Sequence, residues 1–323
     1  MKGRLAIHRH TFDAMGSTVE LILVGGTRRH AAVCFARAEA LADEWEWTFS
    51  RFRPESELRR LNAAGAPFRA SRRLFEGVDA ALTAARATHG LFDPTILPAL
   101  VRLGYDRPFD QMQADGAGVA APNLTSAPTV NQGWESIVLD STSGLIHLPD
   151  GLHLDLGGIA KGLYADSVAD ELAGWPGGMI SAGGDMRLWG TPPDGDRWNV
   201  GIEDPQDAGK NIAWFELESG GVATSGTNRR HWQQAGLQVH HLIDPRTGCS
   251  VESDLQALTV VAGTATQAEV CATALFVSGA LFDDLPARWP LLTLAVAVTD
   301  AGHVQTLYER PGGDPDATRQ RAA

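Results

Sequence analysis

The chain has 323 residues and a formal net charge of −12, with 44% hydrophobic and 20% charged residues. A chain of this length can bury one large core or two medium ones. The negative charge argues against a nucleic-acid backbone or an anionic membrane surface as the main partner, although one local site can still be positive. The three cysteines, Cys34, Cys249 and Cys271, supply neither a disulfide framework nor a CxxC metal motif.

The apolar runs of the chain give no sign of a membrane anchor. None is long enough to span a bilayer, and the first residues lack a continuous apolar stretch with a small-residue cleavage site. We therefore expect no membrane span and a cytoplasmic location, or a periplasmic one if a leader has been removed.

The first half of the chain predicts one strand and two long helices. Residues 18–24 are apolar and partly alternating, which predicts a largely buried strand. Residues 31–48 place Ala38, Leu41 and Trp45 on one face, which predicts a helix. A second helical repeat runs from Leu74 to Ala85, and His89-Gly90 closes it.

The second half of the chain is rich in strands. Residues 106–133 have no periodicity and predict a surface excursion or an internal boundary. From residue 134 onward short apolar segments recur as predicted strands, among them "GLHLDL", with one helix after Gly158 and another near 265–278. We expect an α/β (α+β) fold with a mostly antiparallel or mixed sheet and packed helices, one domain over residues 1–310, and a disordered tail over 311–323.

The stretch "LDLGGIAKGLYAD" brings Asp155, Gly157, Gly158 and Lys161 together before a predicted helix. It matches neither the P-loop GxxxxGK[ST] nor GxGxxG, which disfavours an NAD-type oxidoreductase. Glycines and a helix N-terminus can nevertheless expose backbone N–H groups to an anion, and a lysine adds a full charge. The alternative is a tight junction with a surface lysine, and this stretch alone leaves both open.

Several stretches, taken in order from about residue 12 to 279, resemble the FAD:protein FMN transferase family, the ApbE-type flavin transferases. They are "DAMGSTVEL", "FSRFRPESELRRLN", "GLFDPTILPALVRLGY", "LDLGGIAKGLYAD", "ISAGGDMRLWG", "GVATSGTNRR", "HLIDPRTG" and "TATQAEVCATALFVSG". The resemblance implies a T-fold-like fold. It also implies the Mg²⁺-dependent transfer of FMN from FAD to a Ser or Thr hydroxyl of an acceptor flavoprotein through a phosphoester bond, with release of AMP.

Carried over by position, the resemblance implies a set of FAD contacts and three metal ligands. The FAD contacts would be Met15, Phe52, Leu91, Phe92, Asp93, Asp155, Lys161 and Ile243. Phe52 stands where the family often has Tyr, so ring packing would persist without the hydroxyl. The ligands of Mg²⁺ would be the carbonyl of Gly158 with Glu269 and Thr273, where Glu269 replaces the usual Asp.

The spacing of Glu269 and Thr273, four residues apart on the predicted helix, places both oxygens on one face. The alternative for Glu269 is a capping box with Thr266. His241 is the candidate general base, because a neutral imidazole titrates near the working pH. Asp244 would orient it or simply form the turn, and His240 is the rival base. Two other functions stay open, an Mg²⁺-dependent FAD pyrophosphatase and a non-catalytic flavin-binding protein.

Overall fold

The computed structural model describes most of the chain. The described residues are 5–114, 133–193, 196–234, 236–279, 287, 289–290, 292–310 and 321–322. Most of the excursion expected over 106–133 therefore lies outside them, and its first part contains a short helix, α5 (Phe109–Ala114). The tail expected over 311–323 is described only at β18 (Arg321–Ala322), which pairs with β9 (Asn211–Leu217).

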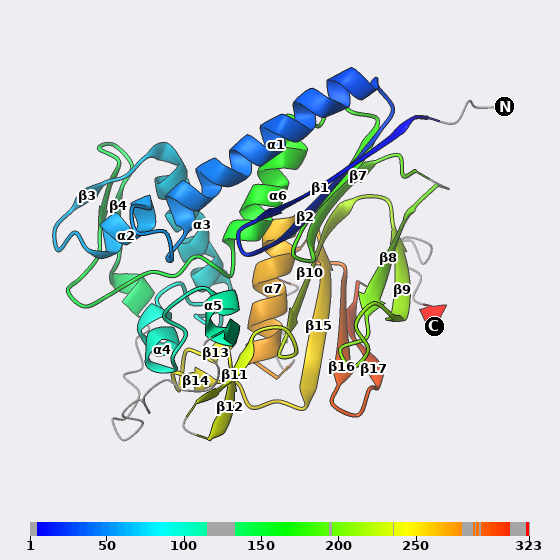
Figure 1. Cartoon of the computed structure of the whole chain (residues 1–323). Coiled ribbons are helices and arrows are strands. Elements are labelled where there is room, and N and C mark those ends of the chain that lie inside the picture. The colour runs from blue at the N-terminus through cyan, green and yellow to red at the C-terminus, as the bar shows by residue number, and fades with distance from the viewer. Residues whose placement is uncertain are drawn as a thin grey trace.

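The centre of the molecule is one sheet of eight strands in which every neighbouring pair is antiparallel (Figure 1). In spatial order its strands are β1 (Ile7–Ala14), β2 (Ser17–Val24), β6 (Gly177–Ala182), β7 (Asp185–Gly190), β10 (Gly220–Gly226), β15 (Leu255–Ala262), β16 (Leu294–Thr299) and β17 (Val304–Glu309). This architecture confirms the predicted fold class, and β2 confirms the strand expected over 18–24.

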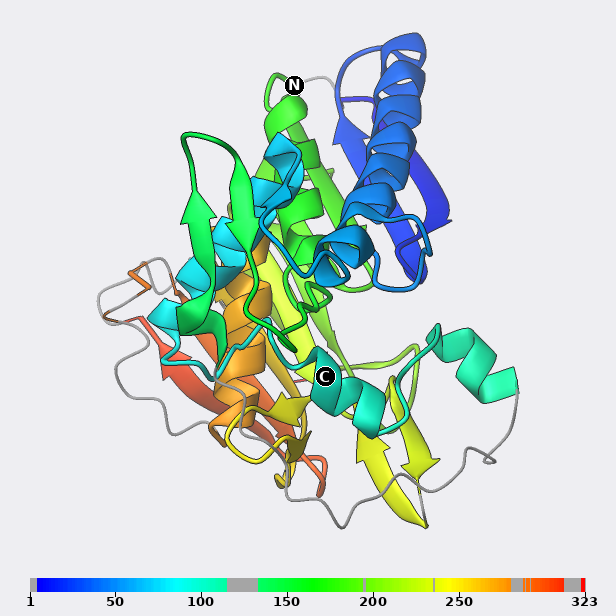
Figure 2. The ribbon, with the colours of Figure 1, turned by 90° about the vertical axis from the view of Figure 1, so that its left-hand side faces the viewer.

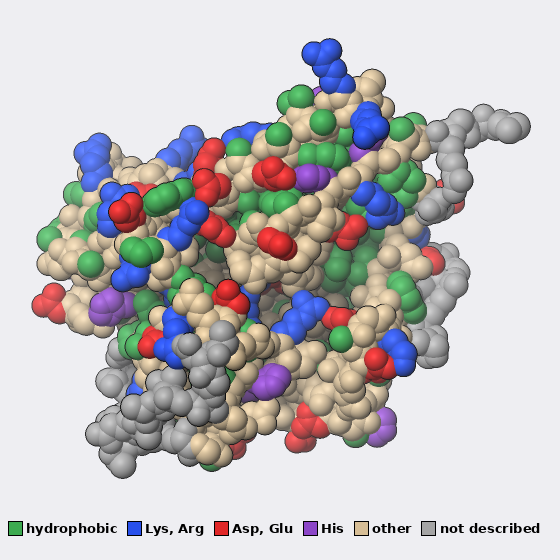
Figure 3. All heavy atoms as spheres, in the orientation of Figure 1, with side chains coloured by type: hydrophobic (Ala, Val, Ile, Leu, Met, Phe, Trp, Pro, Cys, Tyr) green, Lys and Arg blue, Asp and Glu red, His purple; other side chains and the backbone are tan. Residues whose placement is uncertain are grey.

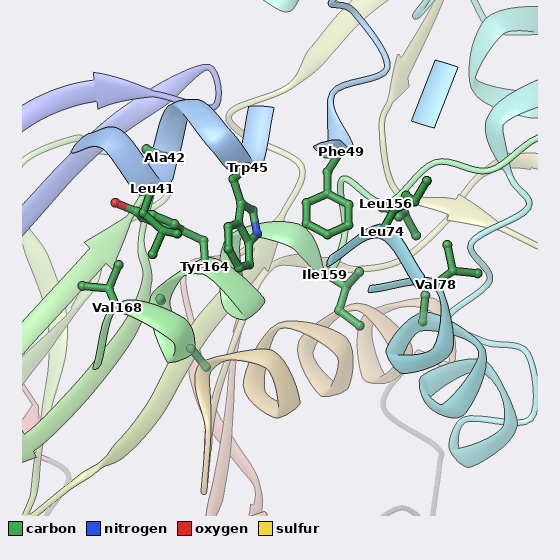
Figure 4. Close-up of a cluster of buried hydrophobic side chains, with 14 of the residues drawn as sticks. Leu41, Ala42, Trp45, Phe49, Leu74, Val78, Leu156, Ile159, Tyr164 and Val168 are labelled. Carbon is green, nitrogen blue, oxygen red and sulfur yellow. The ribbon is translucent and has the colours of Figure 1, made fainter. Parts of the chain in front are cut away.

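Helices cover one face of the sheet. They are α1 (Arg28–Phe49), α6 (Ala160–Glu171) and α7 (Ala265–Val277), with α2 (Glu57–Asn62), α3 (Arg72–Ala87) and α4 (Leu97–Arg102) outside them (Figure 1). Figure 4 shows Trp45 and Phe49 of α1 directed toward α6 and α3. The indole Nε1 of Trp45 donates to the Ala160 carbonyl at 3.1 Å, and the Tyr164 hydroxyl donates to the Ala38 carbonyl at 2.9 Å. These bonds fix the start of α6 against α1.

Both predicted long helices are confirmed, and their side-chain caps explain where they begin. The helix expected over 31–48 starts earlier, at Arg28, because Thr27 accepts a hydrogen bond from the His30 N–H. Ser71 caps α3 in the same way. After α3 the chain turns through His89 and Gly90, both of which have positive φ.

The opposite face of the sheet is covered by strands. β8 (Trp198–Glu203) pairs with β9, and their inward side chains share a core with the facing residues of the central sheet. β2 contributes Leu21 and Leu23 to the helix side and Ile22 and Val24 to the strand side. The sheet is therefore buried on both faces, which is why β2 has a nearly continuous apolar sequence.

Short strands and turns surround this core. One small sheet consists of β3 (Phe68–Arg69), β5 (Leu145–His147) and β4 (Val138–Asp140), and the 3₁₀ turn Gly133–Ser136 directly precedes β4. β11 (His231–Gln234) pairs with β12 (Leu237–His240), and β13 (Ile243–Asp244) with β14 (Cys249–Ser250). Figure 2 looks onto the side of the molecule that carries α3 and the β4–β5 pair. Within the described ranges, no helix combines the length and the apolarity that a membrane span requires.

Candidate functional site

The glycine stretch before α6 is held by contacts from distant segments. The side chain of Asn62 pairs with both the N–H and the carbonyl of Leu154, at 2.8 and 2.9 Å, and the Asp155 N–H donates to the Pro94 carbonyl at 2.8 Å. The "GLHLDL" segment therefore has buried leucines but no strand partner among the described residues, and the prediction of a strand there was wrong. A side chain satisfies the backbone groups that a neighbouring strand would otherwise satisfy.

The carboxylate of Asp155 shapes the turn itself. Its Oδ1 accepts the Gly157 N–H at 2.6 Å, and its Oδ2 lies 2.8 Å from the Nε of Arg51. Gly158 lies against Phe92, whose ring would be 3.2 Å from a Cβ at that position. Two of the predicted FAD contacts, Asp155 and Phe92, are thus brought together by the close approach that this glycine allows.

Lys161, in the first turn of α6, lies between two buried carboxylates. Its Nζ donates to Asp185 and, at 2.6 Å, to Oε1 of Glu269. Burial alone would lower the pKa of Lys161, but the two carboxylates raise it above its ordinary value. Burial and the nearby Asp185 charge together raise the pKa of Glu269 to about 7. The lysine is therefore a permanent cation inside the protein.

Glu269 also binds the start of α6 directly. Its Oε2 accepts the Gly162 N–H at 2.8 Å. Gly162 is the third residue of α6, so its N–H is one of the donors at a helix start that lack an intrahelical acceptor, and Glu269 satisfies it. Gly162 itself is required by close packing, because a Cβ there would be 2.7 Å from the Cα of Thr266.

The capping-box alternative for Glu269 was wrong. The N-cap of α7 is Thr264, which accepts the Gln267 N–H at 3.2 Å. The hydroxyl of Thr266 donates to Asp166 of α6 at 2.6 Å. Glu269 is thereby free to reach Lys161.

The three predicted metal ligands form a set of oxygen donors. Glu269 and Thr273 lie one turn apart on α7, and the Thr273 hydroxyl is 3.3 Å from that of Ser225 at the end of β10. Together with the Gly158 carbonyl they offer a carboxylate, a hydroxyl and a carbonyl, which are donors that suit a hard cation such as Mg²⁺. Among the described residues there is no cluster of three or more His, Cys, Asp or Glu side chains that could hold an ion alone. Further oxygens would therefore have to come from a ligand or from water.

Two tight turns approach the same region. Met15 and Gly16 join β1 to β2 with positive φ, and the Met15 N–H donates to Glu46 at 2.6 Å. A Cβ on Gly183, in the β6–β7 turn, would be 2.9 Å from Ser17 and 3.9 Å from the Cδ of Lys161. The predicted contact Met15 thus belongs to a turn whose neighbour Ser17 meets the β6–β7 turn, and that second turn lies next to Lys161. Figure 3 shows a hollow on this face, between the part that carries α1 with the β1–β2 turn and the part that carries β11 and β12.

Phe52 and Ile243 belong to one apolar cluster. The cluster is built on Leu100, Leu103, Tyr105, Val239 and Ile243, with Phe52, Ile96, Ala99, Phe109, Met112 and Trp232 packed against it. The predicted contacts Leu91 and Phe92 belong instead to the two cores around the helices.

Asp93 is a buried carboxyl with one satisfied oxygen. Its Oδ1 accepts the N–H and the hydroxyl of Thr95, at 2.7 and 2.6 Å, and its Oδ2 has no partner among the described residues. Burial raises its pKa to about 6, against the opposing effect of Thr95. A buried oxygen without a partner is available to a ligand.

His241 and Asp244 have different hydrogen-bond partners. Burial, followed by the charge of Arg230, lowers the pKa of His241 to about 3, and its Nδ1 lies 3.3 Å from the Arg230 carbonyl. Asp244 instead accepts the Arg246 N–H at 2.9 Å and binds the Arg246 guanidinium. Of the two roles considered for Asp244, forming the turn is the one its contacts match. The Nε2 of His240 lies 3.0 Å from the Val251 carbonyl, so the rival base is held within the local strand packing.

Sequence reasoning did not assign Asp185 or Ser225, although both lie in stretches it singled out. Asp185 directly follows a glycine pair, and a charged residue at a glycine turn after a strand is the signal that could have identified it. The partnership of Asp185 with Lys161 requires the fold. The complete arrangement brings together a partly buried ammonium between two carboxylates, oxygen donors that would suit a hard cation, and a backbone turn linked through Arg51 to an aromatic ring.

Comparison with known proteins identifies the family of this chain. The ApbE family model matches residues 15–282, and the chain belongs to that family. A Treponema pallidum FAD:protein FMN transferase is 31% identical over 278 residues, which cover 78% of this chain and 74% of the relative. The enzyme of the same name from Salmonella typhimurium is 28% identical over 274 residues, which cover 82% and 77%.

Solved structures support the same conclusion. The flavin transferase ApbE from Vibrio cholerae superposes with a TM-score of 0.76 at 26% identity and covers 96% of this chain and 99% of its own. An ApbE protein from Thermotoga maritima, at 24% identity and a TM-score of 0.80, shares the fold over 94% of this chain. The family, the fold and the enzyme class predicted from the sequence, a flavin transferase, are confirmed.

Proposed function

We propose that this chain transfers the FMN half of FAD to a Ser or Thr hydroxyl of an acceptor protein, forming a phosphoester bond and releasing AMP, with Mg²⁺ bound. The observation that carries the proposal is the partly buried Lys161 of the glycine stretch, bonded to Asp185 and to Glu269, which lies one turn before Thr273 on α7. The names of the relatives support the choice of FAD as substrate.

The proposed ligands of Mg²⁺ are the Gly158 carbonyl, Glu269 and Thr273. When bound, the ion would reduce the negative charge of the FAD pyrophosphate, which otherwise repels a nucleophile. Lys161 lies in the same region, where Asp185 and Glu269 share its positive charge. Because Lys161 is bonded to two carboxylates, it would keep Asp185 as a partner if Glu269 bound the metal.

The reaction is a substitution at the phosphorus that carries the riboflavin. The acceptor oxygen forms a new bond to this phosphorus, the bond to the bridging oxygen breaks, and AMP leaves with that oxygen. The acceptor hydroxyl must lose a proton. His241 is the proposed acceptor of that proton because it is neutral, although burial lowers its pKa to about 3 and makes it a weaker base than the imidazole expected from the sequence. General-base assistance of this kind typically contributes a factor of about 10²–10⁴ in rate.

The test is flavinylation of an acceptor domain that carries a Ser/Thr flavinylation motif. The purified chain is incubated with FAD, MgCl₂ and the acceptor, and intact mass is measured with and without EDTA. We expect addition of one FMN per acceptor, its loss with EDTA, and its loss in Glu269→Ala and Thr273→Ala. Glu171→Gln is the matched control, because Glu171 is an exposed carboxylate at the other end of α6 from Lys161 and pairs with Arg37 of α1.

The products separate the alternative functions. AMP release without addition of mass to any acceptor would identify the chain as a pyrophosphatase. FAD binding without AMP release, and without an effect of Mg²⁺, would identify it as a flavin-binding protein. Either result would contradict the proposed transfer.

A further inference from the structure

Arg51 is a buried arginine outside the predicted set of FAD contacts and metal ligands. It lies in the connection between α1 and α2, and only 9% of its side chain is exposed. Its Nε pairs with Oδ2 of Asp155 at 2.8 Å, and its Nη1 donates to the Tyr105 carbonyl at 2.7 Å. One side chain thus joins the glycine turn to the α4–α5 region.

The guanidinium is also in contact with two aromatic rings. Its central carbon lies 4.1 Å from the ring centroid of Phe52 and 4.3 Å from that of Tyr105. Contacts of this kind favour arginine over lysine, because the flat guanidinium can cover a ring while its edge donates hydrogen bonds. Arg51 therefore touches two predicted FAD contacts, Asp155 and Phe52.

The third nitrogen of Arg51 has no bond to the part of the chain that the structure describes. Nη2 is buried and has no hydrogen-bond partner among the described residues. A buried charged donor without a partner is costly, and structures rarely retain one without a reason. Other arginines in contact with rings differ in this respect: Arg53 and Arg73 are about one-third exposed and can be hydrated.

We propose that Arg51 is a substrate-binding and positioning residue: it fixes Asp155 and Phe52 and donates a hydrogen bond from Nη2 to an acceptor atom of the bound flavin nucleotide. This inference rests on the proposed function. It assigns a purpose to the unpartnered nitrogen and explains why a buried arginine lies between two predicted FAD contacts. A purely structural arginine would need only the bonds to Asp155 and Tyr105.

The test compares FAD binding by the wild type, Arg51→Lys and Arg51→Gln, measured through flavin fluorescence with MgCl₂ and no acceptor. Lysine keeps the charge for Asp155 but has neither the flat face nor the second donor arm. We expect the FAD dissociation constant to rise about ten- to hundredfold in Arg51→Lys, the effect of losing a hydrogen bond from a charged group. Arg73→Lys is the matched control, since Arg73 pairs with Glu44 and covers Trp45. Its dissociation constant should stay within about twofold.

Steady-state kinetics separate binding from loss of folded protein. If Arg51 binds FAD, the KM for FAD rises in both variants while kcat changes little. A variant that is merely partly unfolded has a lower kcat at an unchanged KM, and this result would overturn the inference. Equal FAD affinity of wild type and Arg51→Lys, with the wild type active, would overturn it without affecting the proposed function. A wild type that fails to bind FAD would overturn both.

Discussion

The substitution Asp93→Asn is expected to stabilise the apo protein and to make that gain depend on pH. Asp93 is 4% exposed, and burial raises its pKa to about 6 from the ordinary 3.8. Ionising this carboxyl therefore costs more in the folded than in the unfolded protein. Below the pKa that Asp93 has in the unfolded protein this cost is absent. It grows as the pH rises from that value through the pKa in the folded protein, and above the folded pKa it is constant.

The magnitude follows from the difference between the two pKa values. At 1.36 kcal/mol per pKa unit, the ionised carboxyl lowers the free energy of unfolding by about 3 kcal/mol at pH 8 and by about 1.5 kcal/mol at pH 5. Asparagine is nearly isosteric and its Oδ1 can still accept the hydrogen bonds from Thr95. The variant should therefore gain about 1.5 kcal/mol more at pH 8 than at pH 5.

Urea denaturation of the apo protein at the two pH values measures this difference. Asp140→Asn is the control, because Asp140 is an exposed turn residue. Its hydrogen bonds lower its pKa from the ordinary 3.8, so this carboxyl is ionised at both pH 5 and pH 8. Its effect should be the same at pH 5 and pH 8. An Asp93→Asn variant with the same effect at both pH values would refute the reasoning. Because Asp93 is also a predicted FAD contact, the stabilised variant should bind FAD more weakly than the wild type.

Two further substitutions test the α6–α7 contact. Gly162→Ala should lower the free energy of unfolding by about 1–3 kcal/mol, because the new methyl group meets the backbone of Thr266. In the same urea experiment Gly174→Ala, where a Cβ meets nothing within 4 Å, should change little, and equal effects would contradict the steric argument. Lys161→Met should lower the free energy of unfolding by about 3–5 kcal/mol at pH 8, because it leaves two buried carboxylates without their cation. If the Lys161→Met variant had the same free energy of unfolding as the wild type, the ammonium would not be what stabilises these two carboxylates in the folded protein.

The parts of the fold that local sequence dictates were predicted well. β2, α1 and α3 each have an apolar pattern and local end signals, so their periodicity was sufficient. The "GLHLDL" segment was wrongly predicted as a strand because its leucines alternate as they do in a strand. Its backbone partner is the side chain of Asn62, 92 residues away from Leu154 along the chain, and no local pattern contains that information.

In the candidate site, too, some features follow from local sequence and others depend on the tertiary fold. The glycine turn and the pair Glu269 and Thr273 were visible as motifs. The capping-box alternative was undecidable locally, because Thr264 and Gln267 offer the same spacing as Thr266 and Glu269. The bonds of Lys161 to residues 24 and 108 positions away depend on how α6, the β6–β7 turn and α7 pack together.

The pairing of β10 with β15 has a consequence for how this protein can vary. Gly226 ends β10 opposite Ala257 of β15, so the intervening segment with β11–β14 leaves and re-enters the sheet at adjacent points. Because the two ends of the segment are adjacent, a change of length in one of its loops costs little and can leave the register of the two strands unchanged. The surface beside the proposed site can therefore differ in shape while the strands beneath, and the positions of His241 and Ile243, are kept.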